Sequence, residues 1–522
     1  MENLHNIKYV IFLIVFIFPG SFDLQAATYY VDSSANNDSG NGSSSSPKKY
    51  ISSGLILMSS SGGDTLLISA GIYSDPKDLI SSNPDEVNRL VSGQPGAYNV
   101  IKAVTDGTVT ITADLKLSGV EQSTASYVQL EGLKWVSNST KSVVGHHIKI
   151  IRCAFEGGPT SGNRTTFGIG TNNPTNNPFE SNNILIEDSW FYGQGGRYNL
   201  LIFNSREVVV RRVIARHDTG WCFDTCGGSG PPEAGLTVYN SKNILVQNFI
   251  VLDSNQEYQY WEGAFYIINN DVLLDNDNTV VEGSLSINNR GTSFKFDGSR
   301  PVTNAVIRNS MSFGVGNGIS LTGPDGSSST LQNLSIINAR VGVQAGSADS
   351  NHDLTNSIIT GSSVVAIFDG SAMAGWTHSY NNCSNNNNGF GNNCNDTGET
   401  TYDALSNGLV YPTRIELGST LITSGQGNSP VGANVTLKLG VTGTIYAETG
   451  FDAETSDSLW PWPHEDRIKS DMCDEISTGV VDRDWCATNQ SLTEYIWGLL
   501  GNTPPTVIIG DLIFIDGFDG FL

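Results

Sequence analysis

The stretch Asn183-Ile184-Leu185-Ile186-Glu187-Asp188 carries the pattern that decides the fold of this chain. Its apolar residues lie two positions apart, and a small polar residue follows them. The phrase returns as EVVVRR at 207–212, NILVQN at 243–248 and NAVIRN at 304–309, with a weaker copy, NTVVEG, at 278–283. This alternation predicts short β-strands that each end in a tight polar turn.

The spacing of the copies predicts the architecture. The first apolar position of each copy falls at residue 184, 208, 244, 279 or 305, with Thr at 279 in the weaker copy. The steps between copies are therefore 24, 36, 35 and 26. The shorter step holds two or three strands with their turns, and the longer step adds a loop of about ten residues. No helical segment separates the strands, so the pattern predicts a parallel β-helix. We expect Ile184, Val208, Ile244 and Ala305 to stack inward in successive coils.

A second strand recurs in the same frame. Its copies are LLIFN at 200–204, LTVYN at 236–240, FKFD at 294–297 and VAIFD at 365–369. Each ends in Asn or Asp, which predicts stacked polar corners with a structural role. Between neighbouring coils the frame predicts surface ion pairs. These are Arg211 with Glu187, Arg212 with Asp188, and Arg308 with Glu282.

Composition limits the class of protein. The chain has 522 residues, 57 glycines, 15% charged residues and a formal net charge of -24. Such a charge argues against a nucleic-acid partner, because phosphate binding needs a basic surface. It does not argue against acidic sugars, because a local basic surface can lie on an acidic protein. We expect a monomer that binds a polysaccharide or other glycan.

The first 26 residues read as a secretory signal peptide. Lys8 precedes an apolar run at 9–18, and small residues follow, ending in Ala26 and Ala27. The run is short for a membrane span. We therefore expect a secreted mature chain without a membrane span.

Cysteine spacing predicts disulfides in an exported chain. The sequence-local pairs are Cys222 with Cys226, Cys383 with Cys394, and Cys473 with Cys486. Cys153 is left over on a strand. A zinc site at Cys222 and Cys226 is the alternative for that pair.

Both ends of the chain resemble a known family. The TYYV strand at 28–31, the GDT strand from Gly63 and the AGIY turn from Ala70 closely resemble the amino-terminal cap of secreted right-handed parallel β-helix proteins of the pectate-lyase-like superfamily. LWPWPHEDRIKSDM from Leu459 and SLTEYIWGLLGN from Ser491 resemble the closing segments of a group of secreted bacterial β-helix proteins. The resemblance covers nearly the whole mature chain. It implies the fold but not an activity, since lyases, hydrolases, epimerases and non-enzymes share it.

These observations divide the chain into five parts. We expect a signal peptide at 1–26, an N-terminal cap at 27–75, the right-handed parallel β-helix at 76–436, a small, partly helical C-terminal cap at 437–501, and a linker and tail at 502–522. Residues 413–431 resemble the last coil. Residues 491–500 form a helical candidate with one apolar face.

Long insertions locate the candidate site. In β-helix enzymes the active site lies outside the coil, beside inserted loops, and the longest insertions here are 220–235 and 253–263. Their neighbours on the same face are the candidates. We predict catalytic roles for Arg216, His217, Asp218, Asp253 and Lys295, and substrate binding by Arg197, Glu262 and Arg290.

Two chemistries fit these residue types. A lyase needs a base and a cation to stabilise an enolate, which His217 and either Lys295 or Arg216 would supply. A hydrolase needs two carboxylates about 5 to 10 Å apart, drawn from Asp218, Asp253 and Glu262. Ca²⁺ is an alternative cation, and the acidic turn at 275–278 is its candidate site. A non-catalytic carbohydrate-binding or surface adhesion solenoid is the alternative to an enzyme.

Overall fold

The computed structural model describes residues 26–499 except 84–85, 87, 118–124, 137–140, 159–164, 171–180, 194–196, 219–233, 255–262, 271–275, 290, 347–348, 370–373, 388–393, 395, 405–414, 416–417 and 474–483. The predicted signal peptide therefore lies almost wholly outside the described residues and stays a prediction. No helix among the described residues is long and apolar enough to span a membrane.

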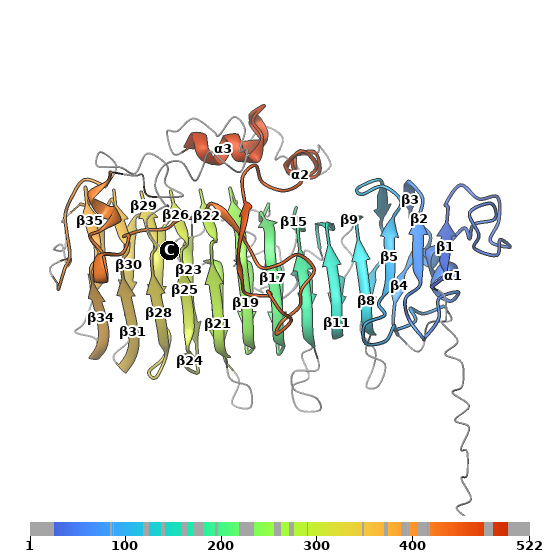
Figure 1. Cartoon of the computed structure of the whole chain (residues 1–522), viewed down its shortest axis with the longest axis horizontal. Helices are drawn as coiled ribbons and strands as arrows, with labels where there is room; N and C mark the ends of the chain where they lie inside the picture. Colours follow the sequence, from blue (N-terminus) through green and yellow to red (C-terminus); the bar gives the residue numbers. More distant parts are fainter. Residues whose placement is uncertain are drawn as a thin grey trace, which may run out of the picture.

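The described strands form a right-handed parallel β-helix with three ladders (Figure 1). The first ladder contains β1 (Thr28–Val31), β2 (Thr65–Ile68), β5 (Asn99–Ala103), β8 (Ala125–Glu131), β11 (Gly145–Ile151), β14 (Asn182–Glu187), β17 (Arg206–Ala215), β19 (Lys242–Leu252), β21 (Asn276–Glu282), β24 (Val302–Thr303), β25 (Ala305–Arg308), β28 (Ser328–Gln332), β31 (Asp349–Thr355) and β34 (Ala374–Ser379).

The second ladder is made of shorter strands that follow the first around a corner. It contains β3 (Gly71–Tyr73), β6 (Val109–Ile111), β9 (Leu133–Val136), β12 (Ala154–Glu156), β15 (Trp190–Tyr192), the ends of β17 and β19, β22 (Leu285–Ile287), β26 (Met311–Phe313), β29 (Ser335–Ile337), β32 (Ile358–Thr360) and β35 (Asn382–Ser384).

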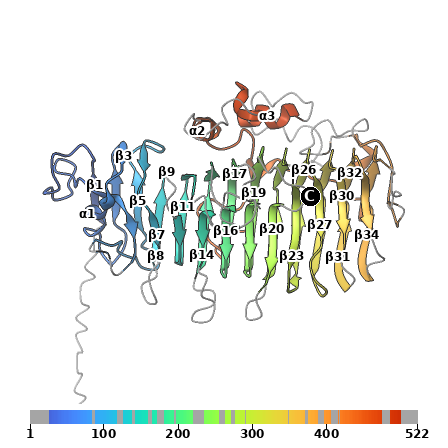
Figure 2. The ribbon, with the colours of Figure 1, turned by 180° about the vertical axis from the view of Figure 1, so that it is seen from behind.

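The third ladder closes each coil and is a separate sheet; β16, β20, β23 and β27 are labelled along it in Figure 2. It contains β4 (Ile80–Ser81), β7 (Leu115–Leu117), β10 (Lys141–Val143), β13 (Thr165–Ile169), β16 (Tyr198–Phe203), β18 (Ala234–Tyr239), β20 (Gly263–Asn269), β23 (Thr292–Gly298), β27 (Asn317–Leu321), β30 (Val341–Ala345) and β33 (Val365–Asp369).

The register confirms the predicted inward stacking. Ile184 pairs with Val208, Val208 with Ile244, and Ile244 with Thr279. One residue further on, Val280 pairs with Val306, which continues the row to Ala305. The four predicted residues are all buried in one continuous core. The second predicted phrase also falls in one sheet, since its copies lie in β16, β18, β23 and β33.

The corners between the first two ladders use the left-handed backbone conformation. Asp188, Arg212, Asn248 and Asn309 all have φ between 49° and 51°. Asn and Asp tolerate this conformation better than other residues with a Cβ. The polar endings of the phrase are therefore required by the turn.

The N-terminal end is closed by a short helix. All residues of α1 (Ile51–Leu55) are buried, and the Ile51 amide donates to Asp78 Oδ1 over 3.2 Å, within the short helix η1 (Pro76–Asp78). The strands β1 to β3 already pair with the coils that follow them. The ladders thus begin inside the segment that we assign to the N-terminal cap.

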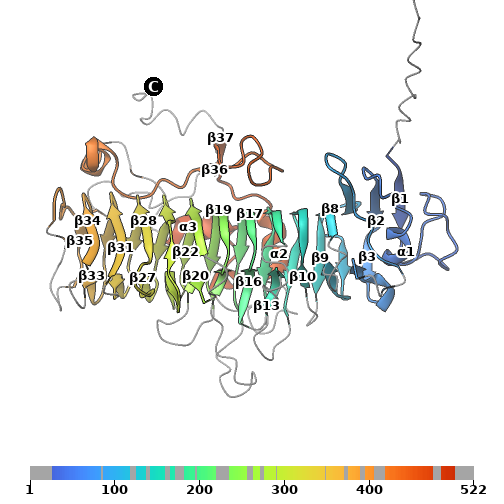
Figure 3. The same cartoon turned by 90° about the horizontal axis from the view of Figure 1, so that it is seen from below.

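The C-terminal part covers the outside of the solenoid. We call its described residues from 418 to 499 the C-terminal cover. It contains η2 (Thr420–Ile422), η3 (Gln426–Asn428), the antiparallel strands β36 (Leu437–Leu439) and β37 (Glu454–Ser458), α2 (Glu465–Met472), η4 (Asp484–Ala487) and α3 (Leu492–Leu499). Figure 3 shows β36 and β37 outside the coils, near β17 and β19.

The cover is hydrogen-bonded to corner residues of successive coils. Asn333 donates to the Pro430 carbonyl over 2.9 Å, and the Gln426 amide donates to Asn356 over 2.8 Å. The prediction of a last coil at 413–431 is therefore wrong. Its described residues form two short 3-10 helices beside the corners, because they satisfy corner amides instead of continuing the ladders. Among the described residues, β35 is the last strand of the solenoid.

The predicted ion pairs are partly confirmed. Arg212 pairs with Asp188 at 2.6 Å, and Arg308 pairs with Glu282. Arg211 lies opposite Glu187 in register, but its guanidinium donates to the Val441 and Thr444 carbonyls of the cover. It is fully buried, so it anchors the cover and is not part of a surface ladder.

Candidate functional site

The outer face of the second ladder is apolar and is buried by the cover. The solenoid residues of this row are Trp190, Ile214, Ile250, Leu285 and Met311, and the cover residues in the same cluster include Trp460, Trp462, Trp485 and Ile496. The buried face of α3 contains Leu492, Tyr495 and Ile496, as the sequence predicts. The face beside the predicted site is therefore occupied by the chain itself.

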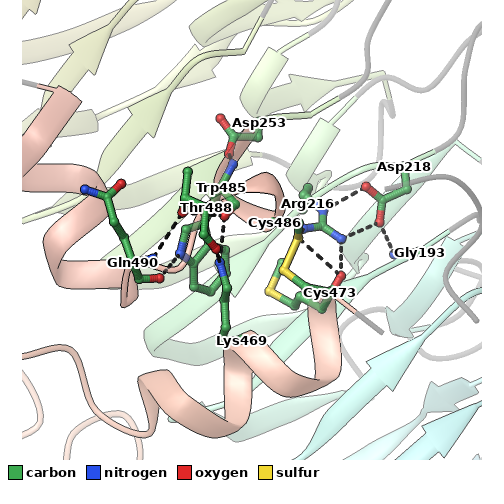
Figure 4. The surroundings of a disulfide bond; sticks show 11 residues. Gly193, Arg216, Asp218, Asp253, Lys469, Cys473, Trp485, Cys486, Thr488 and Gln490 are labelled. Atoms are coloured by element: carbon green, nitrogen blue, oxygen red, sulfur yellow. Dashed lines mark hydrogen bonds and ion pairs between the residues drawn. A yellow bond between two sulfur atoms is a disulfide. The ribbon is translucent and has the colours of Figure 1, made fainter. Parts of the chain in front are cut away.

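Arg216 lies under this cover, where its guanidinium has protein partners on several sides (Figure 4). It donates to both carboxylate oxygens of Asp218, at 2.8 and 3.2 Å, and to the Met472 carbonyl. A further nitrogen lies 3.0 Å from Cys486 Sγ. Asp218 also accepts from the Gly193 amide at 2.9 Å. This buried network joins the solenoid to the cover.

Asp253 is the second point of attachment (Figure 4). Its carboxylate accepts from the Tyr495 hydroxyl at 3.0 Å, the Trp485 amide at 3.2 Å and the Asn288 amide group at 3.2 Å. Burial, followed by the charge of Asp484, raises the pKa of Asp253 to about 6. These contacts favour an anchoring role for Arg216, Asp218 and Asp253, whose catalytic assignment stays a prediction.

His217 follows the end of β17 and stands between Arg216 and Asp218 in the sequence. It is fully buried, and its backbone amide donates to Ser254 Oγ at 3.2 Å, the residue that follows Asp253 in the next coil. The structure therefore brings the backbone of His217 beside the coil of Asp253, as the shared frame predicts. Its role as a base stays a prediction.

Lys295 lies on a different face. Phe294 and Phe296 belong to the core, so Lys295 points outward from the third ladder, as expected from the alternation. Its ammonium lies 3.0 Å from Asp297 Oδ2 and 4.7 Å from the centre of the Tyr266 ring. The Tyr266 hydroxyl donates to the same Asp297 oxygen at 2.9 Å. The three side chains form one cation–carboxylate–phenol cluster.

Electrostatics fixes the protonation state of this cluster. Burial opposes ionisation of Asp297, but the charge and hydrogen bond of Lys295 hold the pKa of that carboxyl below its usual value. Burial, and then the negative charge of Asp297, raises the pKa of the Tyr266 phenol. Asp297 is therefore a carboxylate near neutral pH, and Tyr266 is a neutral proton donor.

Aromatic rings surround the cluster on the third ladder. Arg197 lies 5.5 Å from the centre of the Tyr198 ring, and Asn270 donates to the Tyr239 hydroxyl at 2.6 Å. Tyr198 and Tyr266 are buried with Ala234 and Ile268 in one cluster, against which the partly buried Leu201 and Tyr239 pack. Sequence reasoning missed these tyrosines. Tyr239 was visible as an outward position of the phrase at 236–240.

The candidates thus separate into two groups. Arg216 and Asp253 contact the cover beside the second ladder, and Asp218 binds Arg216 there, whereas Lys295 and Arg197 contact rings and a carboxylate on the third ladder. Glu262 and Arg290 lie outside the described residues. The sequence frame predicted one cluster because it gives the position along the axis, but not which side of the coil a side chain faces.

Two of the three predicted disulfides are confirmed. Cys383 is bonded to Cys394, and Cys473 to Cys486, while Cys153 is a buried thiol. The second bond links α2 to η4 next to Arg216 (Figure 4). Cys222 and Cys226 lie outside the described residues, so their pairing stays a prediction.

The described part of the chain contains no group of three or more His, Cys, Asp or Glu side chains arranged for a metal ion. In the proposed Ca²⁺ turn, Asp275 lies outside the described residues, and Asp277 accepts from Thr303 and Asn304 at 2.8 Å. These bonds fit the structural reading of the turn.

No family model matches this chain, and no curated protein matches it. Similar solved structures include the pectate lyase Pel9A, with 16% identity, a TM-score of 0.37, and coverage of 77% of this chain and 92% of that one. A rhamnogalacturonan lyase has 12% identity, a TM-score of 0.37, and coverage of 68% and 87%. The complex of XylC with xylose has 8% identity, a TM-score of 0.45, and coverage of 72% and 86%. The strand pairings establish the parallel β-helix by themselves.

Proposed function

We propose that the protein is an exported carbohydrate-active β-helix that takes an acidic polysaccharide along the outer face of its third ladder. The observation that carries this proposal is the cluster of Lys295, Asp297 and Tyr266 beside the rings of Tyr198 and Tyr239, in which Asp297 and Tyr239 are the partly exposed members. Rings provide apolar surface for sugar faces, and the polar groups provide hydrogen bonds and charge.

The cluster suits elimination better than hydrolysis. The Lys295 ammonium, which lies 3.0 Å from Asp297 Oδ2, neutralises a uronate carboxylate and stabilises the enolate that forms next to it. The neutral Tyr266 phenol donates a proton to the leaving oxygen. Hydrolysis needs two available carboxylates. Asp218 and Asp253 are already held by the arginine and by the cover.

The sequence predicts His217 as the base, but its side chain is fully buried, so the described residues do not supply the base of this elimination. The His217 backbone lies at the edge of the second ladder, in the coil that leads into β18. The alternative is a non-catalytic glycan-binding solenoid. This alternative is favoured because Asp218 and Asp253, which the sequence predicts as catalytic acids, already form hydrogen bonds within the protein.

The test is to assay the mature protein on polyuronates and neutral polysaccharides, following both ultraviolet absorbance of unsaturated products and reducing ends. We expect unsaturated products from a polyuronate. Lys295→Ala should lower this turnover by about 10²-fold or more, as expected for losing a charge-stabilising group. Lys242→Ala is the matched control, because Lys242 lies on the first ladder.

Each outcome decides between the readings. Unsaturated products that depend on Lys295 support the elimination. If the wild-type protein binds a polysaccharide but releases no products, the binding alternative is supported. If the folded wild-type protein neither binds nor cleaves any polysaccharide, the proposed site is overturned.

A further inference from the structure

The first ladder places two consecutive histidines on one side of the chain. In a regular strand, His146 and His147 of β11 would point to opposite faces. His147 has φ +53°, a left-handed conformation that interrupts the alternation before the buried Ile148. Both imidazoles are therefore partly exposed and close together.

The distance between the two rings fits a shared ion. His146 Nδ1 and His147 Nδ1 lie 3.0 Å apart, and the ring planes are at 87°. With metal–nitrogen bonds of about 2.0–2.1 Å, this separation subtends about 90°, whereas a tetrahedral ion would need the nitrogens about 3.4 Å apart. Right-angled nitrogen ligands are typical of square-planar or tetragonal Cu²⁺ and Ni²⁺.

The surroundings hold both rings in place. Tyr127 stacks on His147 at 4.5 Å and meets the edge of His146 at 5.6 Å. Burial lowers the pKa of both imidazoles, so they are neutral near pH 7, which is the form that binds metals.

The charged groups that act on His147 are Lys149, Glu207 and Glu448. The Lys149 ammonium donates to the Gly443 carbonyl at 2.7 Å, and the Glu207 carboxylate lies 3.8 Å from the Arg206 guanidinium.

We propose that His146 and His147 form a surface site for Cu²⁺ or Ni²⁺, bound through both Nδ1 atoms with water in the remaining positions. The site lies on the first ladder, whereas Lys295 lies on the third. It does not depend on the proposed carbohydrate activity.

The neighbouring coil supplies conservative test variants. His146 pairs in register with Asn182, and Asn183, with φ +53°, holds the place of His147. His146→Asn and His147→Asn therefore introduce residues that this ladder already accepts, and the melting temperature should not change. His378→Ala is the control, because His378 is a partly buried histidine between Glu399 and Asp396.

The experiment uses the mature protein without an affinity tag, stripped with a chelator and titrated with Cu²⁺. We expect one tightly bound Cu²⁺ ion per chain. Its electron paramagnetic resonance spectrum should show hyperfine coupling to two imidazole nitrogens. Each Asn variant should lose one nitrogen coupling and at least about tenfold in affinity, one ligand being worth 1.4 kcal/mol or more. His378→Ala should bind like the wild type.

Three results would overturn the proposal. The wild type binds no ion, which would mean that the short Nδ1–Nδ1 distance is a hydrogen bond between two tautomers. Binding persists unchanged in either Asn variant. Binding is lost in His378→Ala, which would move the site to the other end of the solenoid.

Discussion

Lys141 puts an ammonium group inside the solenoid. It pairs in register with Leu115, a core residue, and its Nζ donates to the Glu156 carbonyl at 3.1 Å and the Gly157 carbonyl at 2.7 Å. Burial lowers the pKa of Lys141 from 10.5 to about 7, although Glu156 and Asp114 oppose the shift. Keeping an ammonium group charged inside the protein is a cost to the folded state.

The sign of this effect gives a prediction for stability against pH. Between pH 7 and 10.5 the unfolded chain keeps a proton that the folded protein has released, so stability rises with pH in this window. Below pH 7 the full cost of burying the charge is present. Lys141→Met should therefore raise the melting temperature most at pH 6, and the gain should shrink towards pH 10.

Thermal melts of both proteins across this pH range check the prediction. Lys102→Met, at a partly exposed lysine on the first ladder, is the control and should show no such pH-dependent difference. A Lys141→Met protein that is less stable than the wild type by the same amount at every pH would show that the two carbonyl hydrogen bonds outweigh the charge.

At the scale of the element, Asn248 connects a corner of the solenoid to the cover. Its φ is +49°, its side-chain oxygen accepts from the Leu439 amide at 2.7 Å, and its amide donates to the Leu437 carbonyl at 3.3 Å. Asn248→Gly keeps the left-handed turn but loses both bonds to β36. Asn248→Ala also adds backbone strain of about 1–2 kcal/mol.

The expected order of melting temperatures is wild type, then Asn248→Gly, then Asn248→Ala. Hydrogen exchange at the Leu439 amide should accelerate in both variants, because its acceptor is removed in each. Equal melting temperatures for the Gly and Ala variants would contradict the strain at this corner. Unchanged exchange at Leu439 would contradict the anchoring of β36.

The ladders were predictable from the sequence because their signal is local. The alternation around Ile184 and Val208 gives the buried face directly, and the step between copies gives the coil. The role of Arg216 was not predictable in this way. Its partners Met472 and Cys486 lie 256 and 270 residues further along the chain, and no local pattern places them over the second ladder.

Lys295 shows what an alternation can and cannot give. The pattern Phe294-Lys295-Phe296 correctly predicted that the lysine points outward. It did not predict Tyr266 as a partner, since Tyr266 belongs to the preceding coil and reaches Lys295 only through the register of β20 against β23. Asp297, two positions after Lys295 on the same strand, lies on the same side of β23. Candidate residues were therefore found singly, but their grouping required the structure.

At the scale of the whole molecule, the cover and the solenoid share a second apolar core. Trp190, Ile214 and Ile250 are fully buried on the outside of the second ladder, where Trp485 and Ile496 pack in the same cluster. A solenoid without the cover would present a continuous apolar face to water. Surfaces of this kind promote association.

A chain that ends at Thr436 should therefore bind a hydrophobic dye, associate in solution, and melt more than about 5 °C below the full chain, since a loss of 1 kcal/mol shifts a large domain by several degrees. It also loses Met472, Cys486, Trp485 and Tyr495, and so leaves Arg216 and Asp253 without these partners.

A chain that ends at Asn502 is the matched control, because it keeps the whole described cover, and it should behave like the full chain. Dye fluorescence, light scattering and thermal melts of the three proteins decide the matter. A Thr436-terminated protein that stays monomeric, binds no dye and melts with the full chain would show that the second ladder is stable without its cover.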